Sequence, residues 1–374
     1  MRIAVDGRYI QDHFPGIGRY AYSLIRAMSA ASPENEYIVY FDPSVPNSRF
    51  DVSGLATPGV LLREMRLSVF SPRNVWSWRE LVRRDAADVY VSPYYLMPVL
   101  LPCPAVVVFH DLIARKFPQY ISSVRARAYF RFTLYLSTRR AAAVVTDSGA
   151  SQRDLADVYR LRPTRLHLVH PGVDQVFYPR SSEESRRVLE PYGLPERYVL
   201  YFGTNKPHKN LPFLVRSWRR VAEALPGQGL GLVIGGHDDS RYRETRDEVE
   251  RLGLGGTVIF LGDFPEGLLP NLYSRAELFA FPSLYEGFGL PVLEAMACGT
   301  PVICSNSSSL PEVTGDAAIL LPPCDEVSWS EEIVRLSIDS ELRDRLRCAG
   351  LKRAGEFSWE RSASQLLEVF KKVV

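Results

Sequence analysis

Residues 281–300 read FPSLYEGFGLPVLEAMACGT, and this stretch decides the fold of the second half of the chain. The short apolar run Leu278–Phe281 is typical of a buried strand in a parallel sheet. Glycines in the following loop allow backbone angles that a side chain would forbid. Pro291 suits a first helical turn and Gly299 the position just past a helix, which predicts a helix over Pro291–Cys298. A strand, a glycine-bearing loop and a short helix therefore follow one another.

Two glutamates accompany this unit, Glu286 in the loop and Glu294 on the helix. The amino end of the helix faces the loop, and its unpaired N–H groups and dipole favour a phosphate. A carboxylate beside a phosphate is repelled by it unless the carboxylate accepts hydrogen bonds. Sugar hydroxyls are neutral hydrogen-bond donors that suit both glutamates. This combination predicts a sugar-nucleotide site. The alternative is a plain strand–loop–helix unit with two solvated glutamates.

The pattern Glu286-x7-Glu294, inside SLYEGFGLPVLEAMACGTPVI, resembles the signature of retaining glycosyltransferase family 4, the glycosyl transferases group 1. The resemblance implies the GT-B fold: α/β, with two Rossmann-like doubly wound domains facing a central cleft. It also implies that Glu286 contacts the donor sugar hydroxyls and that Glu294 binds the ribose. The residues whose backbone would receive the sugar and diphosphate are Gly287, Phe288, Gly289 and Leu290.

The length of 374 residues exceeds what one core usually supports, so two domains are expected. We place an acceptor-side domain at 1–175 and a nucleotide-sugar domain at 176–356. In this fold the terminal helix, 357–374, crosses back to the first domain. No apolar run approaches the ~18–20 residues of a membrane helix, and MRIAVDGR reads as a strand and not as a signal peptide. A cytoplasmic protein is therefore expected.

A catalytic metal finds no support in the sequence. The five cysteines show no C-x2-C spacing, Asp-x-Asp does not occur, and the six histidines show no H-x3-H spacing. Structural thiols, no catalytic metal and no cofactor are expected.

Charge is unevenly distributed along the chain. Residues 1–180 hold 23 Lys+Arg and 15 Asp+Glu, a balance of +8, whereas the remainder holds 22 and 28, a balance of −6. Two aromatic and arginine-rich stretches, 70–84 and 115–140, lie in the basic half. Such stretches are attracted to anionic lipid headgroups, which predicts a peripheral membrane contact; the alternative is a solvated basic helix face. No nucleic-acid-binding motif accompanies the charge, so nucleic acid is not an expected partner.

The first half alternates short apolar strands with helical segments, which predicts a doubly wound sheet. After the strand Arg2–Asp6 we expect a loop, Gly7–Arg19, and then a helix, Tyr20–Ala30. The letters Gly16-x-Gly18-x-x-Ala21 fit a dinucleotide fingerprint, which raises an NAD-dependent oxidoreductase as an alternative; the glycines, however, lie about ten residues beyond the strand instead of directly after it. The family resemblance instead implies that Gly16, with Gly18 second, lies against the donor diphosphate.

His110 directly follows the strand Ala105–Phe109, where the carboxyl ends of parallel strands place ligands. A histidine there can donate to a sugar hydroxyl or to developing charge. In the family, a histidine at this place lines the pocket near the donor sugar. The alternative is a structural histidine at a strand end.

The loop 203–210, GTNKPHKN, follows the first strand of the second domain and carries the candidate cations. A lysine in such a loop can neutralise a departing diphosphate. Lys209 matches the family's lysine, whereas Thr204 stands where the family often has arginine after Gly203. Lys206 is the expected substitute and His208 a second basic position.

Phe264 follows another strand, in the loop Gly262-Asp263-Phe264. In the family this loop holds the nucleobase, which makes Phe264 a candidate wall; the alternative is a simple core residue. Farther along, the serines after Cys304 are expected to cap a helix that begins at Leu310.

The function implied by the resemblance is retaining transfer of a hexose from a nucleoside diphosphate sugar to an acceptor hydroxyl of a glycan or lipid-linked glycan. GDP-mannose is the favoured donor, because Gly16–Tyr20 resembles mannosyltransferases, and a UDP-sugar is the alternative. No side chain is an evident nucleophile or base. The competing hypotheses are a sugar-nucleotide-binding protein without turnover and a hydrolase or phosphorylase of the same fold.

Overall fold

The computed structural model describes residues 1–121 and 123–374, and the chain divides into two compact units. The first unit comprises Met1–Gly172 and Phe357–Val374, and the second comprises Val173–Glu356. The chain leaves the first unit at a tightly packed glycine: a Cβ on Gly172 would lie 2.2 Å from the backbone nitrogen of Trp359. Only glycine allows the two chain segments to lie this close.

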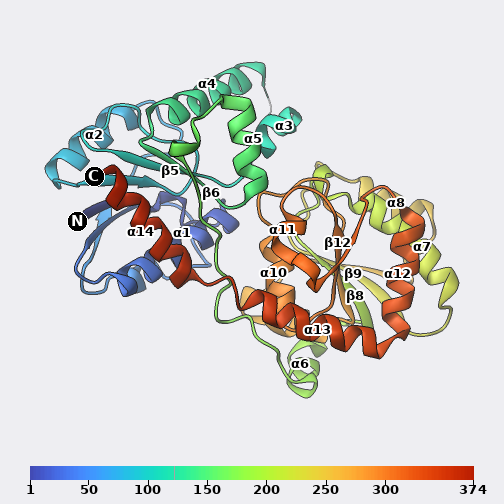
Figure 1. Ribbon diagram of the computed structural model, residues 1–374. Helices are drawn as coiled ribbons and strands as arrows, with labels where there is room; N and C mark the ends of the chain where they lie inside the picture. Colours follow the sequence, from blue (N-terminus) through green and yellow to red (C-terminus); the bar gives the residue numbers. More distant parts are fainter. Residues whose placement is uncertain (122) are drawn as a thin grey trace. The chain divides into compact units, whose positions relative to one another are not determined.

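The described part of the first unit contains a seven-stranded parallel sheet with helices on both faces (Figure 1). Its strand order is β3-β2-β1-β4-β5-β6-β7. The strands are β1 Arg2–Asp6, β2 Glu36–Phe41, β3 Val60–Glu64, β4 Val89–Ser92, β5 Ala105–Phe109, β6 Ala143–Thr146 and β7 Leu166–Leu168. The helices are α1 Pro15–Ala31, α2 Asn74–Arg84, α3 Ile113–Lys116, α4 Val124–Arg140, α5 Gly149–Tyr159 and α14 Trp359–Val373.

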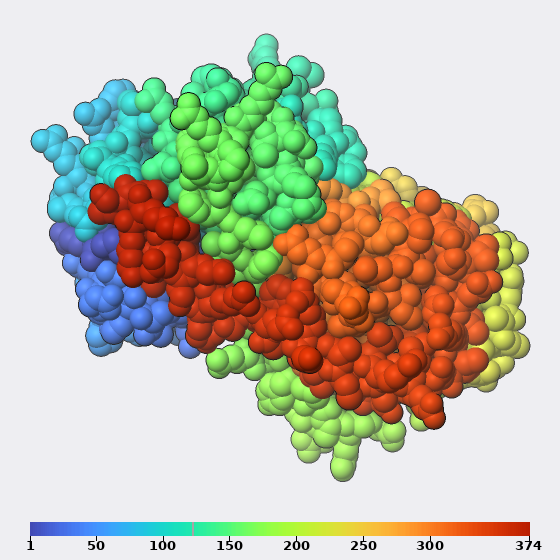
Figure 2. Space-filling view, viewed as in Figure 1, coloured from blue at the N-terminus to red at the C-terminus, as the bar shows by residue number. Residues whose placement is uncertain are grey.

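The terminal helix α14 completes the core of the first unit. It packs against α1, as the red and dark blue helices of Figure 1 show. Trp359 at its start is buried, and its ring meets that of Tyr20 edge to face, with 5.6 Å between the ring centroids. The outer side of α14 remains on the surface as a red band (Figure 2). Trp359 is therefore an anchor of the first unit.

The described part of the second unit contains a six-stranded parallel sheet in the order β10-β9-β8-β11-β12-β13. The strands are β8 Arg197–Phe202, β9 Leu230–Gly235, β10 Val258–Gly262, β11 Leu278–Phe281, β12 Val302–Ser305 and β13 Ile319–Leu321. The helices are α6 Ser182–Leu189, α7 Leu211–Ala224, α8 Glu244–Arg251, α9 Leu269–Arg275, α10 Leu290–Ala297, α11 Leu310–Thr314, α12 Glu326–Ile338 and α13 Ser340–Ala354.

Both units are doubly wound, which confirms the predicted α/β class. In each sheet the strand order reverses beside the first strand: between β1 and β4 in the first unit, and between β8 and β11 in the second. Ligands of open parallel sheets bind at the carboxyl ends of the strands at such a reversal. The residues after these four strands are therefore the places to look for a site.

Two boundaries differ from the sequence-based expectation. Helix α1 begins at Pro15, so Gly16 and Gly18 belong to its first turn and not to a loop. The preceding segment is a short 3-10 helix, Gly7–Tyr9, because the Asp6 carboxylate accepts from the N–H of Arg8. The interpretation of Gly7–Arg19 as one glycine-rich loop is wrong.

Across the described residues, no helix has the length and apolar composition needed to cross a bilayer.

Candidate active site

The loops after β8 and β11 meet at the strand-order reversal of the second unit. These strands are parallel neighbours, with Leu278 opposite Val199 and Phe279 opposite Leu200. The first loop carries Lys209 on a short 3-10 helix, Pro207–Lys209, and the second carries Glu286. Parallel pairing places both loops at the same edge of the sheet.

Lys209 and Glu286 form an ion pair across this edge. The Nζ of Lys209 donates to Oε1 of Glu286 at 2.6 Å, and both side chains are largely buried. The ammonium also lies 5.1 Å from the ring centroid of Phe281. The pair brings together the predicted cation and the predicted sugar-binding carboxylate, which are 77 positions apart in the sequence.

Two asparagines hold the lysine-bearing loop in place. The side-chain amide of Asn205 donates to Oδ1 of Asp238 and to two backbone carbonyls of the loop after β9. Asn210 has a positive φ of 61° and donates to the carbonyls of Pro282 and Pro323. These contacts tie the loop to both of its neighbours, so the backbone that carries Lys209 is fixed. Our sequence analysis missed both asparagines; their positions in GTNKPHKN were the available signal.

Three consecutive serines fix the loop that carries Glu286. The Ser307 hydroxyl donates to the carbonyl of Ser283, and the Ser308 hydroxyl accepts from the N–H of Glu286 at 2.8 Å. The Ser309 hydroxyl lies 2.7 Å from the carbonyl oxygen of Phe288 and 3.1 Å from that of Glu286. Ser309 precedes α11 but makes no side-chain cap hydrogen bond. The expectation that these serines cap that helix is wrong, because the loop uses their hydroxyls.

Helix α10 begins directly after this loop. Gly289 precedes it with a φ of 110°, and a Cβ there would lie 2.8 Å from Cδ2 of Leu310. Helix α10 spans Leu290–Ala297, one residue earlier at each end than expected, with Pro291 in its first turn. Gly287, Phe288 and Gly289 are buried and Leu290 is half-buried. The predicted diphosphate-binding backbone thus lies at the amino end of a helix, as expected from its dipole.

Glu294 projects from α10 and is buried. Its Oε2 accepts a hydrogen bond from the Tyr273 hydroxyl at 3.2 Å. Burial, with a smaller contribution from the Glu294 carboxylate, raises the pKa of the neighbouring Cys298 thiol to about 12. A carboxylate can accept several hydrogen bonds, and the role of Glu294 as a ligand of ribose hydroxyls stays a prediction.

Glu294→Ala is expected to weaken binding of the free nucleoside diphosphate by about 10- to 100-fold, the value of one or two charge-assisted hydrogen bonds. Isothermal titration with GDP and with UDP measures it. Tyr273→Phe keeps the carboxylate and serves as the control. Unchanged nucleotide affinity in Glu294→Ala contradicts the ribose role.

His208 lies beside Lys209 but is buried, and this changes its charge. Burial, together with the smaller effects of Lys209 and Lys206, lowers its pKa to about 3. The imidazole is therefore neutral near pH 7. The interpretation of His208 as a second basic position is wrong, because the interior of the loop does not solvate a second cation. Lys206 is half-buried at the start of the same 3-10 helix and remains the candidate substitute.

The neutral His208 predicts an acid-sensitive fold. Between its unfolded pKa near 6.5 and its folded pKa of about 3, only the unfolded chain binds this proton. The free energy of unfolding should therefore fall by about 1 kcal/mol per pH unit as the pH decreases from about 6.5 to 5. In His208→Gln this slope should be smaller in urea titrations. His237→Gln removes an exposed imidazole and is the matched control; an equal slope in His208→Gln refutes the assignment.

A small hollow lies at the carboxyl ends of β8, β9 and β10. Its lining includes Gly203, Gly235, Gly236, Phe260 and Arg246. Gly236 has a φ of 105°, and a Cβ there would lie 2.3 Å from the carbonyl oxygen of Gly203. The guanidinium of Arg246 lies 4.1 Å from the ring centroid of Phe260. The backbones approach closely here because glycines occupy the strand ends.

Phe264 is placed differently. Its side chain is buried, and its ring lies 4.7 Å from that of Tyr192, measured between centroids. The residues that line the hollow do not include it. Its role as a nucleobase wall stays a prediction, while its packing is that of a core residue.

In the first unit, His110 follows β5 and both ring nitrogens face acceptors. Nδ1 lies 2.6 Å from Oδ2 of Asp147, and Nε2 lies 2.7 Å from the carbonyl oxygen of Pro93. Burial lowers the pKa of His110, but the Asp147 carboxylate and the Pro93 carbonyl outweigh it, and the net shift is upward. The geometry is that of an imidazolium with both N–H groups engaged. Contact with a donor sugar would require His110 to release one of these bonds.

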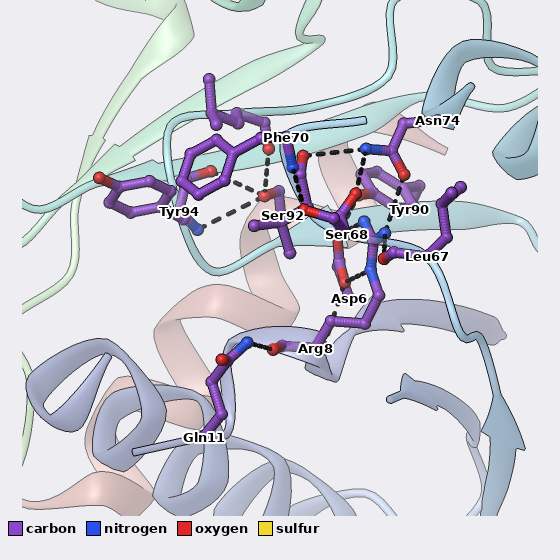
Figure 3. A network of polar contacts seen from close by, with 12 residues as sticks. Asp6, Arg8, Gln11, Leu67, Ser68, Phe70, Asn74, Tyr90, Ser92 and Tyr94 are labelled. Atoms are coloured by element: carbon purple, nitrogen blue, oxygen red, sulfur yellow. Dashed lines mark hydrogen bonds and ion pairs between the residues drawn. The ribbon is translucent and has the colours of Figure 1, made fainter. Parts of the chain in front are cut away.

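The strand-order reversal of the first unit contains a polar network that our sequence analysis missed (Figure 3). The guanidinium of the buried Arg8 donates to both oxygens of Asp6, at 2.8 and 2.7 Å. It also donates to the carbonyl of Leu67 and to the side chain of Asn74. The network ties the chain after β3 to the end of β1. The letters VDGR at the end of the first strand were the only local signal.

The two predicted glycines of α1 differ in their surroundings. Gly16 is exposed, and no atom lies within 4 Å of the position of a Cβ. Gly18 is buried, with a Cβ position 3.0 Å from the Phe50 ring and 3.1 Å from the Tyr9 carbonyl. Gly18 is thus required by packing. Neither glycine forms the strand-to-helix turn of a dinucleotide fingerprint, so the NAD-dependent alternative loses its structural basis.

The residues 1–121 and 123–374 contain no group of three or more His, Cys, Asp or Glu side chains arranged to hold a metal ion.

Comparisons with known proteins agree on the type of molecule. The family model "Glycosyl transferases group 1" matches residues 182–353, and "Glycosyltransferase Family 4" matches residues 15–177. The O-antigen chain mannosyltransferase B of Escherichia coli is 32% identical over 387 residues, which cover 99% of this chain and 100% of that protein. The serotype-specific mannosyltransferase WbdA of the same species is 27% identical over 410 residues, which cover 100% of this chain and 48% of WbdA.

Solved structures with the same fold include a sucrose-phosphate synthase from Thermosynechococcus elongatus, with a TM-score of 0.76, 23% identity and coverage of 100% of this chain and 98% of that one. Anabaena Alr3699/HepE in complex with UDP-glucose has a TM-score of 0.76, 19% identity and coverage of 99% of each chain.

Proposed function

This chain belongs to glycosyltransferase family 4, the glycosyl transferases group 1, and we propose that it transfers a hexose from a nucleoside diphosphate sugar to an acceptor hydroxyl with retention at the anomeric carbon. The observation that carries the proposal is the buried pair of Lys209 and Glu286 at the strand-order reversal of the second unit. A cation and a carboxylate at this edge suit the two parts of the donor, the diphosphate and the sugar.

The pair suggests an exchange of partners on donor binding. Without donor, Glu286 neutralises Lys209 at 2.6 Å. A bound diphosphate offers the ammonium a stronger anionic partner, while the sugar hydroxyls offer donors to the carboxylate. As the glycosidic bond breaks, negative charge grows on the diphosphate, and Lys209 and the amino end of α10 stabilise it. Both groups thus stabilise the transition state more than the bound donor.

The acceptor proton is proposed to go to the leaving diphosphate. Lys209 holds the Glu286 side chain, and serine hydroxyls hold the loop that carries it. A side chain fixed in this way can position the sugar. Attack by the acceptor on the face that the diphosphate leaves accounts for retention without a protein nucleophile. We assign no protein base, and the reaction as proposed uses no metal or separate cofactor.

GDP-mannose is the proposed donor. The support is the pair of relatives named as mannosyltransferases, one of which aligns over its whole length. A UDP-sugar is the alternative, since the fold also occurs in a protein solved with UDP-glucose.

The proposed acceptor is a glycan in cell-surface polysaccharide synthesis or a lipid-linked glycan at the cytoplasmic face of a membrane. The support is the O-antigen relative together with a group of aromatic rings at the β1 and β4 ends of the first unit. Tyr94 lies 5.1 Å from Tyr9 and 5.9 Å from Phe14, and Phe14 lies 6.4 Å from the half-exposed Phe70, between ring centroids. Tyr9 is buried, whereas the other three rings are partly exposed and can pack against the apolar faces of sugar rings.

The test is release of nucleoside diphosphate from GDP-mannose and from UDP-glucose, with and without a mannose-containing acceptor. Release that needs the acceptor supports transfer, and the anomeric configuration of the product, read by NMR, decides retention. Release without acceptor indicates a hydrolase. Donor binding without release under either condition indicates a sugar-nucleotide-binding protein.

A further inference from the structure

Helix α4, Val124–Arg140, exposes an unusual number of large apolar side chains. Val124, Tyr129, Phe132 and Tyr135 are 76, 50, 58 and 47% exposed, and helical spacing places them on one face. The opposite face holds the helix in place: Leu134 is buried in the core, and the Phe130 ring meets Tyr95 edge to face. The exposed rings are therefore not needed for the fold.

The same face is strongly basic. The helix contains five arginines and no acidic residue. Arg125, Arg131 and Arg139 are exposed among the aromatic rings, and the guanidinium of Arg139 lies 5.2 Å from the Tyr135 ring centroid. Burial and the nearby Arg139 and Arg162 lower the pKa of Arg165, which reflects the concentration of positive charge at the carboxyl end of the helix.

Helix α2, Asn74–Arg84, carries the other basic stretch but differs in character. Trp76 is its large exposed aromatic residue, and Glu80 shares its exposed side. Arg84 is paired with Asp85 at 3.1 Å. The charge of α2 is thus partly neutralised, whereas α4 contains no acidic residue of its own.

We propose that the exposed face of α4 is a docking surface for an anionic lipid bilayer. Two tyrosines, each with an apolar ring and a polar hydroxyl, and the apolar Phe132 lie between arginines, which matches the interface between headgroups and acyl chains. A second copy of this chain is a poorer occupant, because a two-fold contact would set arginines against arginines. The inference deepens the proposed function, since a lipid-linked acceptor lies at such a surface.

The test is sedimentation with vesicles of phosphatidylcholine containing a minor fraction of phosphatidylglycerol. Tyr129→Ser with Phe132→Ser is expected to lower the partition coefficient about tenfold or more, through lost burial of two rings. Changing Arg125, Arg131 and Arg139 to Gln should lower it by up to about fivefold per arginine, and salt should weaken binding of the unmutated protein. The matched controls on α2 are Trp76→Ser and the triple change of Arg79, Arg83 and Arg84 to Gln. These variants should lower the partition coefficient much less.

Transfer to a short soluble acceptor separates this inference from the proposed function. We expect the α4 variants to keep that activity and their thermal stability while losing vesicle binding. Absent or salt-independent binding of the unmutated protein overturns the inference, as do equal losses from the α2 and α4 variants. A dimer in sedimentation equilibrium that Phe132→Ser dissociates, without vesicle binding, would assign the surface to self-association instead.

Discussion

Lys209→Ala should lower kcat by about 10²- to 10³-fold, the loss seen when one preorganised charge-stabilising donor is removed. The ammonium is held by Glu286 and by a loop tied down on both sides, so it is in place before negative charge develops on the diphosphate. Its effect should be larger on turnover than on the KM for the donor, because it acts most strongly as charge grows. Steady-state kinetics with donor and acceptor both varied measures the split.

Two variants make this prediction specific. Lys209→Arg should recover part of the turnover, because it restores the charge at a different length. Lys206→Ala removes the other lysine of the loop and should lower kcat far less. If Lys209→Ala left kcat unchanged while Lys206→Ala lowered it strongly, Lys206 would be the cation that binds the diphosphate. The ion pair of Lys209 with Glu286 would then be structural.

Glu286→Gln should lower turnover by roughly 10²-fold or more, since positioning of the reacting sugar is lost. Binding of the free nucleoside diphosphate should not weaken, because the substitution removes the anion that holds Lys209 at 2.6 Å. The two glutamates of the signature should therefore have opposite profiles: Glu294→Ala should weaken nucleotide binding, and Glu286→Gln should slow the transfer. Titration calorimetry with GDP, next to kcat, distinguishes them.

Glu250→Gln removes an exposed carboxylate from the same unit and is the control for the change in net charge. Loss of GDP affinity in Glu286→Gln, of the same size as in Glu294→Ala, would contradict this division of roles. A drop in thermal stability large enough to unfold the variant at the assay temperature would show that the ion pair supports the fold, and the kinetic comparison would then use a lower temperature.

Much of the fold followed from local pattern. Short apolar runs bounded by glycine and proline predicted strands β1, β5 and β11 within a residue or two of their observed ends. The helix after Gly289 was shifted by one residue. The prediction was wrong at helix α1. This helix begins at Pro15 and contains glycines, a composition that resembles a turn. Packing of α1 against α14 and the core stabilises the helix.

The sequence by itself determined the class of fold, because strand and helix periodicity and glycine conformations are properties of neighbouring residues. It also contained the signature whose resemblance to the family named the candidate residues. Only the tertiary structure decided that Lys209 meets Glu286, that the serines before α11 serve the Glu286 loop, and that His208 is neutral. It also decided which basic helix presents several exposed aromatic rings on one face. The physical reason is that burial, charge state and contact depend on groups distant in the chain, which parallel strand pairing brings to one edge of a sheet.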